Sequence, residues 1–101
     1  AKQAIGVAVL PLTPGIIRQL GIDPSTRGVV VAGVDDEGDA AAKGIQRGDV
    51  ILSANNRPTT TEAELNAAVR EVASAGRPAI LLQVLRRGQP AAFVPVRLRG
   101  K

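Results

Sequence analysis

The side chains that most often perform catalysis in proteins are scarce in this sequence. It contains no histidine and no cysteine, so it offers neither a serine–histidine pair nor a thiol nucleophile. Ser25, Ser53 and Ser74 therefore have no histidine to activate them, and the lysines show no serine–lysine spacing. We expect no catalytic residue in this chain.

Carboxylates gather in one short segment, at Asp35, Asp36, Glu37 and Asp39. A calcium loop needs alternating oxygen ligands and a bidentate glutamate at a fixed distance, and this cluster is nearly continuous. Acidic residues are common in turns and at helix starts for capping reasons alone. The glycines likewise occur at turn and helix-end positions and form no phosphate-binding loop. We therefore predict no metal site and no cofactor.

Length and composition predict a single domain over residues 1–101. Hydrophobic residues make up 45% of the chain and charged residues 22%, which is typical of a globular domain with one modest core. No apolar run approaches the roughly 18 to 20 residues of a membrane helix. The start at Ala1 lacks a signal-peptide pattern, as an excised domain of an exported protein also would.

The formal net charge of +4 raises the question of nucleic acid. Proteins that bind nucleic acid add aromatic platforms or a groove-reading helix to their positive charge. Phe93 is the only aromatic residue here, and the basic residues of the last third suit a solvated strand face and tail. We expect no nucleic-acid partner.

Hydrophobic periodicity predicts a mostly β fold. Strands are expected at 4–10, 28–34, 50–52, 57–59, 79–85 and 92–98, with helices at 13–20, 39–43 and 61–73. This pattern corresponds to a small, partly open β-barrel or sandwich of five to six strands, capped by two to three short helices.

Local signals mark the ends of several of these elements. Thr13 and Thr61 are predicted N-caps, the second in a capping box with Glu64. Asp39 is the predicted cap of the middle helix, and Pro11 is expected to end the first strand because proline has no N–H to donate.

The remaining turn signals lie between strands. Asn55-Asn56 predicts a tight reversal, since asparagine tolerates positive φ better than most residues. Arg87-Gly88-Gln89-Pro90 predicts a hairpin turn between the last two strands.

Two segments together resemble a known family. Ala41 to Leu52 combines a small-residue helix, a glycine stop and Gly-Asp-Val-Ile, and an Asn turn follows; this resembles the centre of a PDZ domain. Ile5-Gly6-Val7 resembles the turn with which PDZ domains hold a peptide carboxylate. The physical basis is a nest, in which convergent backbone N–H groups bind an anion.

The order of the segments resembles the permuted PDZ arrangement of the HtrA, or Do-type, periplasmic serine proteases. The binding strand comes first, the 92–98 strand comes last, and Leu12 to Ile22 is similar to the insertion found in those proteins. Asn56, Lys43 and Gly38-Asp39-Ala40 depart from the family pattern without touching the predicted groove, and the cap at 38–40 is expected to survive. The resemblance implies a periplasmic location, and the end of the chain favours the second, C-terminal PDZ copy.

The resemblance also implies where a peptide binds. The carboxylate-binding loop is Ala4, Ile5, Gly6 and Val7, the peptide-pairing strand is Val7, Ala8 and Val9, the groove side of the helix is Glu62, Asn66, Val69 and Ala73, and Lys2 is a candidate cation on the carboxylate side.

Helix geometry separates this groove stripe from a core stripe. Leu65, Ala68 and Val72 fall within about 60° of one another, and the groove stripe is rotated from them by roughly 90°. Val69 fits a core position equally well, and along the first strand either Ile5 with Val7 or their neighbours can face the core. The small apolar lining predicts a terminal Val, Ala or Leu, bound with an affinity on the order of micromolar.

The resulting hypothesis is a non-catalytic module of a serine endopeptidase. It binds C-terminal or extended segments of unfolded or substrate proteins by strand addition, or it contacts other domains or protomers of the parent protease in assembly and regulation during protein quality control. Alternatives are a purely structural assembly domain with a vestigial groove, and a PDZ domain of a site-2 or tail-specific protease or secretion scaffold. An enzyme in its own right is disfavoured because histidine and cysteine are absent.

Overall fold

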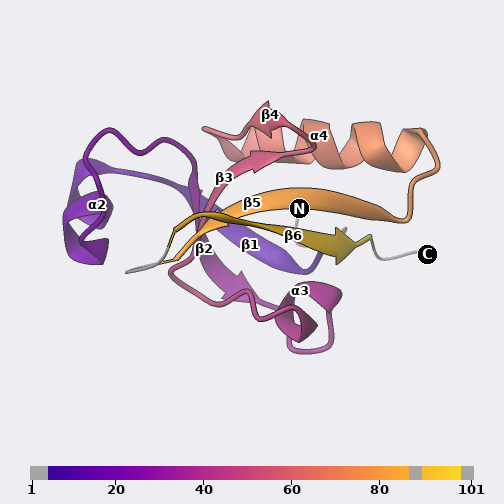
Figure 1. Ribbon diagram of the computed structural model, residues 1–101, viewed down its shortest axis with the longest axis horizontal. Helices are drawn as coiled ribbons and strands as arrows, with labels where there is room; N and C mark the ends of the chain where they lie inside the picture. The colour runs from indigo at the N-terminus through magenta and orange to yellow at the C-terminus, as the bar shows by residue number, and fades with distance from the viewer. Residues whose placement is uncertain (1–4, 87–89, 99–101) are drawn as a thin grey trace.

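One antiparallel sheet of six strands organises the computed structural model, which describes residues 5–86 and 90–98 (Figure 1). The strands are β1 (Val7–Pro11), β2 (Val29–Val34), β3 (Val50–Ala54), β4 (Arg57–Pro58), β5 (Ala79–Leu85) and β6 (Ala92–Arg97). The helices are α2 (Pro14–Leu20), α3 (Asp39–Ala42) and α4 (Glu62–Ser74). The predicted mostly β fold, with its numbers of strands and helices, is confirmed.

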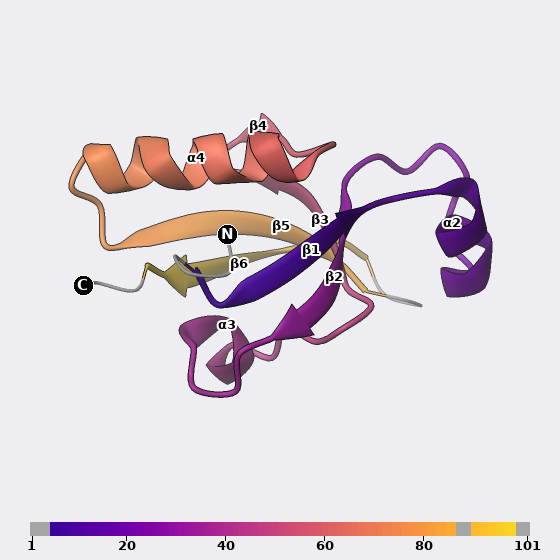
Figure 2. The same cartoon turned by 180° about the vertical axis from the view of Figure 1, so that it is seen from behind.

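The sheet is open, with two edges. Its strand order is β1-β2-β3-β5-β6, and β4 pairs with β3 beside this path. The helix α4 lies along one side of the sheet, α3 lies on the other, and α2 stands at one end (Figure 1 and Figure 2). The strands β1 and β6 are therefore the outermost members of the main path.

The core fills the space between the sheet and α4. Along β5, Ile80, Leu82 and Val84 are buried at every second position, as expected for a strand with one face in the core. From α4, the predicted core stripe of Leu65, Ala68 and Val72 is buried against them. The helix is thus held by its apolar stripe rather than by intrinsic propensity alone.

The local end signals are confirmed at three sites. The Thr13 hydroxyl accepts a hydrogen bond from Ile16 N at 3.2 Å and caps α2. Thr61 and Glu64 form the predicted capping box at the start of α4. Asn55 and Asn56 adopt φ values of 54° and 65°, which is the reversal expected between β3 and β4.

Pro11 corrects one prediction. It does not end β1 but forms its last residue, in register with Val29 of β2. A proline is tolerated in an edge strand where its missing N–H would point away from the neighbouring strand.

The prediction that Asp39 caps α3 is also wrong, because Gly38 is the N-cap of α3 and makes no side-chain cap bond. The cap expected at 38–40 is therefore absent.

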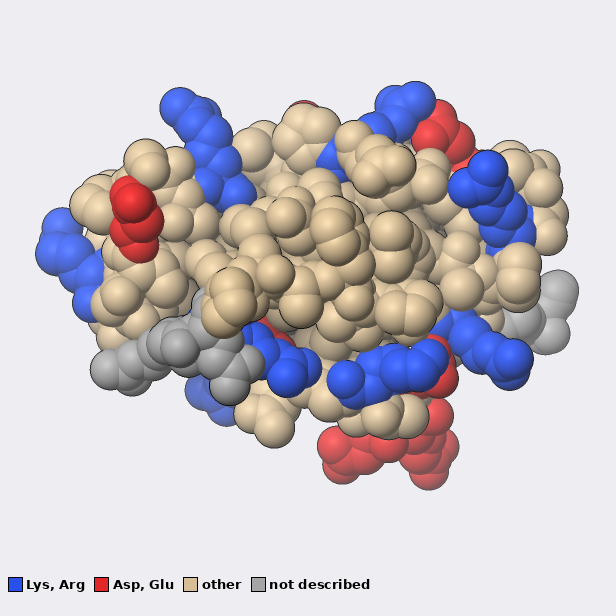
Figure 3. Space-filling model, in the orientation of Figure 1, with Lys and Arg blue, Asp and Glu red and all other residues tan. Residues whose placement is uncertain are grey.

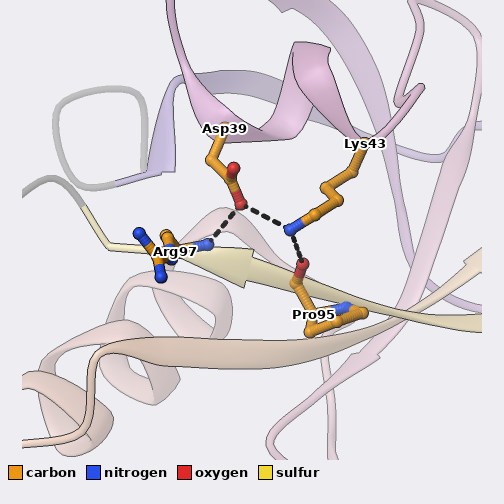
Figure 4. A network of polar contacts seen from close by, with 4 residues as sticks. All are labelled: Asp39, Lys43, Pro95 and Arg97. Carbon is orange, nitrogen blue, oxygen red and sulfur yellow. Dashed lines mark hydrogen bonds and ion pairs between the residues drawn. The ribbon is translucent and has the colours of Figure 1, made fainter.

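The Asp39 side chain acts instead on the outer edge of β6 (Figure 4). Its Oδ2 accepts hydrogen bonds from the backbone N–H of Arg97 at 2.8 Å and from Lys43 Nζ at 3.0 Å. Lys43 Nζ also donates to the backbone oxygen of Pro95 at 3.2 Å. We call this pair of α3 side chains the α3 clamp, because it occupies backbone groups that an added strand would need.

Pro95 completes the closure of this edge. Leu98 N donates to Pro78 O on the β5 side, and backbone groups alternate in direction along a strand. By that alternation Pro95 and Arg97 point outward, where proline has no N–H to offer. Protected edges of this kind prevent sheets from pairing with other chains.

The Gly-Asp-Val-Ile segment owes its shape to a buried carboxylate. Asp49 is 8% exposed, and its Oδ2 accepts hydrogen bonds from Gln46 N at 2.9 Å and Arg86 Nε at 3.3 Å. Arg86 also donates to Gly44 O, so one side chain ties the 44–49 loop to the end of β5. Of the predicted hairpin turn at 87–90, residues 87–89 lie outside the described residues.

The α3 clamp generates a prediction for acid stability. The hydrogen bond from the Arg97 amide, followed by that from Lys43, lowers the pKa of Asp39 below its ordinary value. A lowered folded-state pKa stabilises the fold above the unfolded-state pKa of about 3.9, and this stabilisation is lost as the pH falls through the lower folded-state value. We expect Asp39→Asn to be less stable than the wild type at neutral pH and to lose less stability on acidification.

Thermal unfolding followed by circular dichroism, from neutral pH to about pH 2, measures this difference. Asp36→Asn is the matched control, because Asp36 is exposed in the turn before α3 and its substitution removes the same charge. Identical pH profiles for the two variants would contradict the role of the clamp.

Candidate functional site

The predicted carboxylate-binding loop lies at the start of β1. Ile5 is helical and buried, and Gly6 follows it with a φ of 74°. A helical residue followed by a left-handed one turns successive backbone N–H groups toward the same point, which is the geometry of an anion-binding nest. Ala4 and Lys2, the other predicted members of this region, lie outside the described residues.

The strand β1 directs alternate backbone groups away from the sheet. Gly6 O accepts a hydrogen bond from Asp35 N at 2.8 Å, so Gly6 points its carbonyl toward β2. Because direction alternates along a strand, Val7 points its N–H and C=O outward. The predicted peptide-pairing residue Val7 is therefore correctly oriented for a further strand.

Val9 has the same orientation as Val7, for a separate reason. Its partner in the register is Val31, whose N–H and C=O bond to residues 48 and 49 rather than to β1. Val9 therefore also points outward. The register shifts between Ala8 and Val9, where the partner on β2 changes from Gly33 to Val31. The irregularity is therefore in β2, and Val7 and Val9 keep the same outward direction along β1. We call the outward groups of Val7 and Val9 the β1 edge.

The β1 edge lies beside α4. No strand among residues 5–86 and 90–98 pairs with the outer side of β1, and α4 packs against β1 as well as β3 and β5. The helix runs antiparallel to β1, so that its N-terminal end lies on the side toward which the arrow of β1 points (Figure 2). An added strand would therefore lie between β1 and α4.

The side chains of β1 resolve an alternative that the sequence left open. Ile5, Val7 and Val9 are 1%, 0% and 6% exposed and belong to the core, whereas Ala8 is half-buried. The side chains of β1 that face the core are therefore those of Ile5, Val7 and Val9. Ile5 and Val7 can therefore take part in the predicted site only through their backbone groups.

The predicted groove stripe of α4 is graded rather than uniform. Glu62 and Ala73 are exposed and Asn66 is half-buried, as expected for a face beside a binding strand. Val69 is only 4% exposed and packs in the same cluster as Ile5 and Val7. Val69 therefore belongs to the core, which is the alternative role that its position on the helix allowed, and its part in the groove stays a prediction.

The acidic start of α4 is fixed in place by hydrogen bonds. The Thr60 hydroxyl, the Thr60 amide and the Thr61 amide all donate to Glu64, and the Thr60 hydroxyl is the leading cause of a lowered pKa. Glu64 is therefore an anion at neutral pH whose Oε1 already accepts these hydrogen bonds. It is a capping group rather than a candidate acid or base.

Charge on the surface is distributed in separate groups. Figure 3 shows the face of the sheet near β5 and β6, where lysine and arginine lie at the margins of a broad uncharged area. Leu81 of β5 and Phe93 of β6 are 40% and 58% exposed. The acidic side chains of 35–39 form no metal site within the described ranges, and no described helix has the length and apolar character needed to cross a membrane.

The sequence matches the PDZ domain family over residues 4–93. This chain belongs to the PDZ domain family. The match covers β1, α4 and nearly all of the sheet, so the arrangement of the β1 edge beside α4 is the arrangement of a PDZ domain.

Relatives of this PDZ domain come from proteases. It is 47% identical over 58 residues to a probable periplasmic serine endoprotease, DegP-like, of Brucella suis, which is 57% of this chain and 11% of that protein. A DegP-like protein of Chlamydia pneumoniae is 34% identical over 71 residues, or 70% of this chain and 14% of that protein. The chain thus spans a small part of the length of these relatives.

Solved structures that are similar to this chain also come from HtrA-type proteins. The HtrA3 PDZ domain bound to a phage-derived ligand, FGRWV, superposes with a TM-score of 0.73 at 26% identity, covering 94% of this chain and 84% of that one. The HtrA-type protease AlgW with a decapeptide gives a TM-score of 0.66 at 34% identity, covering 98% of this chain and 30% of that one. The expected resemblance to HtrA-type PDZ domains is confirmed.

The turn at Gly6 generates a prediction about stability. A side chain in the left-handed region costs roughly 1–2 kcal/mol, and Gly6 has a φ of 74°. Gly6→Ala is therefore expected to lower the free energy of unfolding by about that amount in a urea titration.

Gly33→Ala is the control for this substitution. Gly33 is paired with Ala8 on the neighbouring strand, and an added Cβ there meets nothing within 4 Å. Its free energy of unfolding should remain near that of the wild type. Equal losses in the two variants would mean that the turn at Gly6 imposes no special conformation.

Proposed function

We propose that this PDZ domain binds the C-terminal ends of other polypeptides by adding them to β1 as a further strand. The observation that carries this proposal is the difference between the two sheet edges. The α3 clamp and Pro95 occupy the outer edge of β6, whereas the outward groups of Val7 and Val9 face the space beside α4. Strand addition uses backbone hydrogen bonds of this kind.

The turn at Gly6 supports a free carboxylate as the end of the ligand. Convergent N–H groups at Ile5, Gly6 and Val7 favour a negative charge, and an antiparallel peptide paired with β1 would end beside them. The solved HtrA3 PDZ domain and AlgW, both similar to this chain, hold peptides. Val69 supports a small terminal side chain, because this residue of the predicted groove stripe is only 4% exposed and leaves little side-chain surface to contact.

The parent protein is proposed to be a periplasmic serine endoprotease of the HtrA type, as the names of its relatives suggest. Catalysis would then reside outside this domain, since the chain has no histidine or cysteine. The domain would present substrate or regulatory C-termini to the protease. Its assignment to the second, C-terminal PDZ copy stays a prediction.

A second candidate is contact with another domain or protomer of the same protease. The paired strands β5 and β6 support it, because they carry the exposed apolar residues Leu81 and Phe93, and Phe93, the one aromatic residue of the chain, is 58% exposed. Exposed apolar patches commonly mark protein interfaces. In this case the β1 edge would be vestigial or covered by a neighbouring chain.

A pair of peptides tests the carboxylate. Peptides that end in valine with a free carboxylate should shift the amide resonances of residues 5–9, Asn66 and Val69 in an NMR titration. The same peptides with an amidated end should bind about tenfold more weakly or worse, because charge-assisted hydrogen bonds are worth roughly 1.5–3 kcal/mol. Equal affinity of acid and amide, or no binding, would favour the second candidate.

A pair of α4 variants tests the terminal pocket. Val69→Ala and Val72→Ala remove the same atoms from buried positions, which are 4% and 1% exposed. Each should lower stability by about 1–3 kcal/mol. Only Val69→Ala should also weaken binding of the valine-ending peptide, by about three- to tenfold, since only Val69 belongs to the predicted groove stripe of α4.

Isothermal titration calorimetry at a temperature where both variants are folded separates the two effects. Loss of affinity in both variants in proportion to their stability would place Val69 in the core alone. Such a result would leave the β1 edge intact and remove the proposed pocket.

A further inference from the structure

A hollow of about 330 Å³ lies beyond the end of β1. Apolar Leu12, Ile17 and Pro24 and polar Thr26, Arg27 and Thr60 line it. We call it the upstream hollow, because it lies at the end of β1 opposite Gly6.

The position of the upstream hollow follows from its lining. Leu12 comes directly after β1, and Thr60 comes directly before the N-cap of α4. A peptide antiparallel to β1, with its carboxylate beside Gly6, would enter between β1 and α4 at this end of the molecule (Figure 2). Counting one residue opposite each residue of β1, about the fifth residue before its last would lie opposite Leu12.

Backbone pairing ends just before this point. Val7 and Val9 point N–H and C=O outward, and by the same alternation Pro11 is the next outward residue. Pro11 has no N–H, so an added strand loses a donor there. Peptide residues beyond Pro11 would therefore depend on their side chains for any contact, and the upstream hollow is the surface they meet.

The charge in the upstream hollow is positive. Arg27 is the only charged residue in its lining, is exposed, and takes part in none of the ion pairs found in the described part of the chain. The acidic residues nearest to the lining along the chain are Asp23, before Arg27, and Glu62 and Glu64, after Thr60; Glu62 is exposed and outside the lining. Asp23 accepts hydrogen bonds from Ser25 N and Oγ, and Glu64 accepts them from Thr60 and Thr61.

We propose that the upstream hollow is a second subsite, which binds a glutamate side chain about five residues before the C-terminus of the bound polypeptide. Arg27 binds the side-chain carboxylate of this glutamate, and Leu12 and Ile17 pack against its methylene groups. The inference rests on the proposed strand addition at β1. It implies that the domain distinguishes polypeptides by a residue well upstream of their ends, in addition to the terminal residue.

Peptides of about eight residues that end in valine with a free carboxylate test the subsite. They carry glutamate or glutamine at the upstream position, placed in turn at each of three neighbouring positions, and are titrated into the wild type and Arg27→Gln. We expect glutamate to bind about two- to fivefold more tightly than glutamine in the wild type, as for an exposed ion pair. The preference should disappear in Arg27→Gln and shrink with added salt.

Arg97→Gln is the matched control, because it removes the same charge at the opposite edge of the sheet. It should keep the preference for glutamate, and amide shifts at Thr26, Arg27 and Thr60 should appear only with the longer peptides. A glutamate preference that persists in Arg27→Gln, or is absent from the wild type at all three positions, would overturn the subsite. A peptide of the last four residues alone distinguishes the two proposals, since its failure to bind along with the longer ones would overturn strand addition itself.

Discussion

The structure depends on how an open sheet treats its two edges. Every edge strand presents backbone N–H and C=O groups that no neighbour satisfies, and such groups attract other chains. In this domain the two edges are treated in opposite ways. Side chains from α3 and a proline occupy one of them, while the other is left beside a helix and behind a glycine turn. Binding at β1 is thereby separated from unwanted pairing at β6.

Features that depend on neighbouring residues were predictable from the sequence. The caps at Thr13 and Thr61 and the Asn55-Asn56 reversal use partners within four residues, so that the pattern itself contains both partners. The core stripe of α4 was predictable for a related reason, because helical periodicity places apolar residues on one face whatever they pack against.

Features that depend on distant partners were not predictable. Asp39 resembles a helix cap locally, but its carboxylate bonds to Arg97, 58 residues away, and no periodicity reports that contact. The burial of Val69 in the core, although it lies on the predicted groove stripe, depends on how closely α4 approaches β1, which a helical wheel does not contain. Pro11 stays in β1 because its missing donor points outward, and that direction is known only once the register with β2 is known.

The distance between Asp39 and Arg97 also matters while the chain is folding. Contacts between residues far apart in sequence form late, because closing a long loop must be compensated by the contacts that follow. A chain in which β5 and β6 have paired but α3 has not yet docked has its sheet nearly complete and its last edge unprotected. Unpaired edges in such partly folded forms are the sites where chains join one another. The α3 clamp therefore protects this edge only after α3 has docked, and the interval before docking is when chains that fold close together can join at β6.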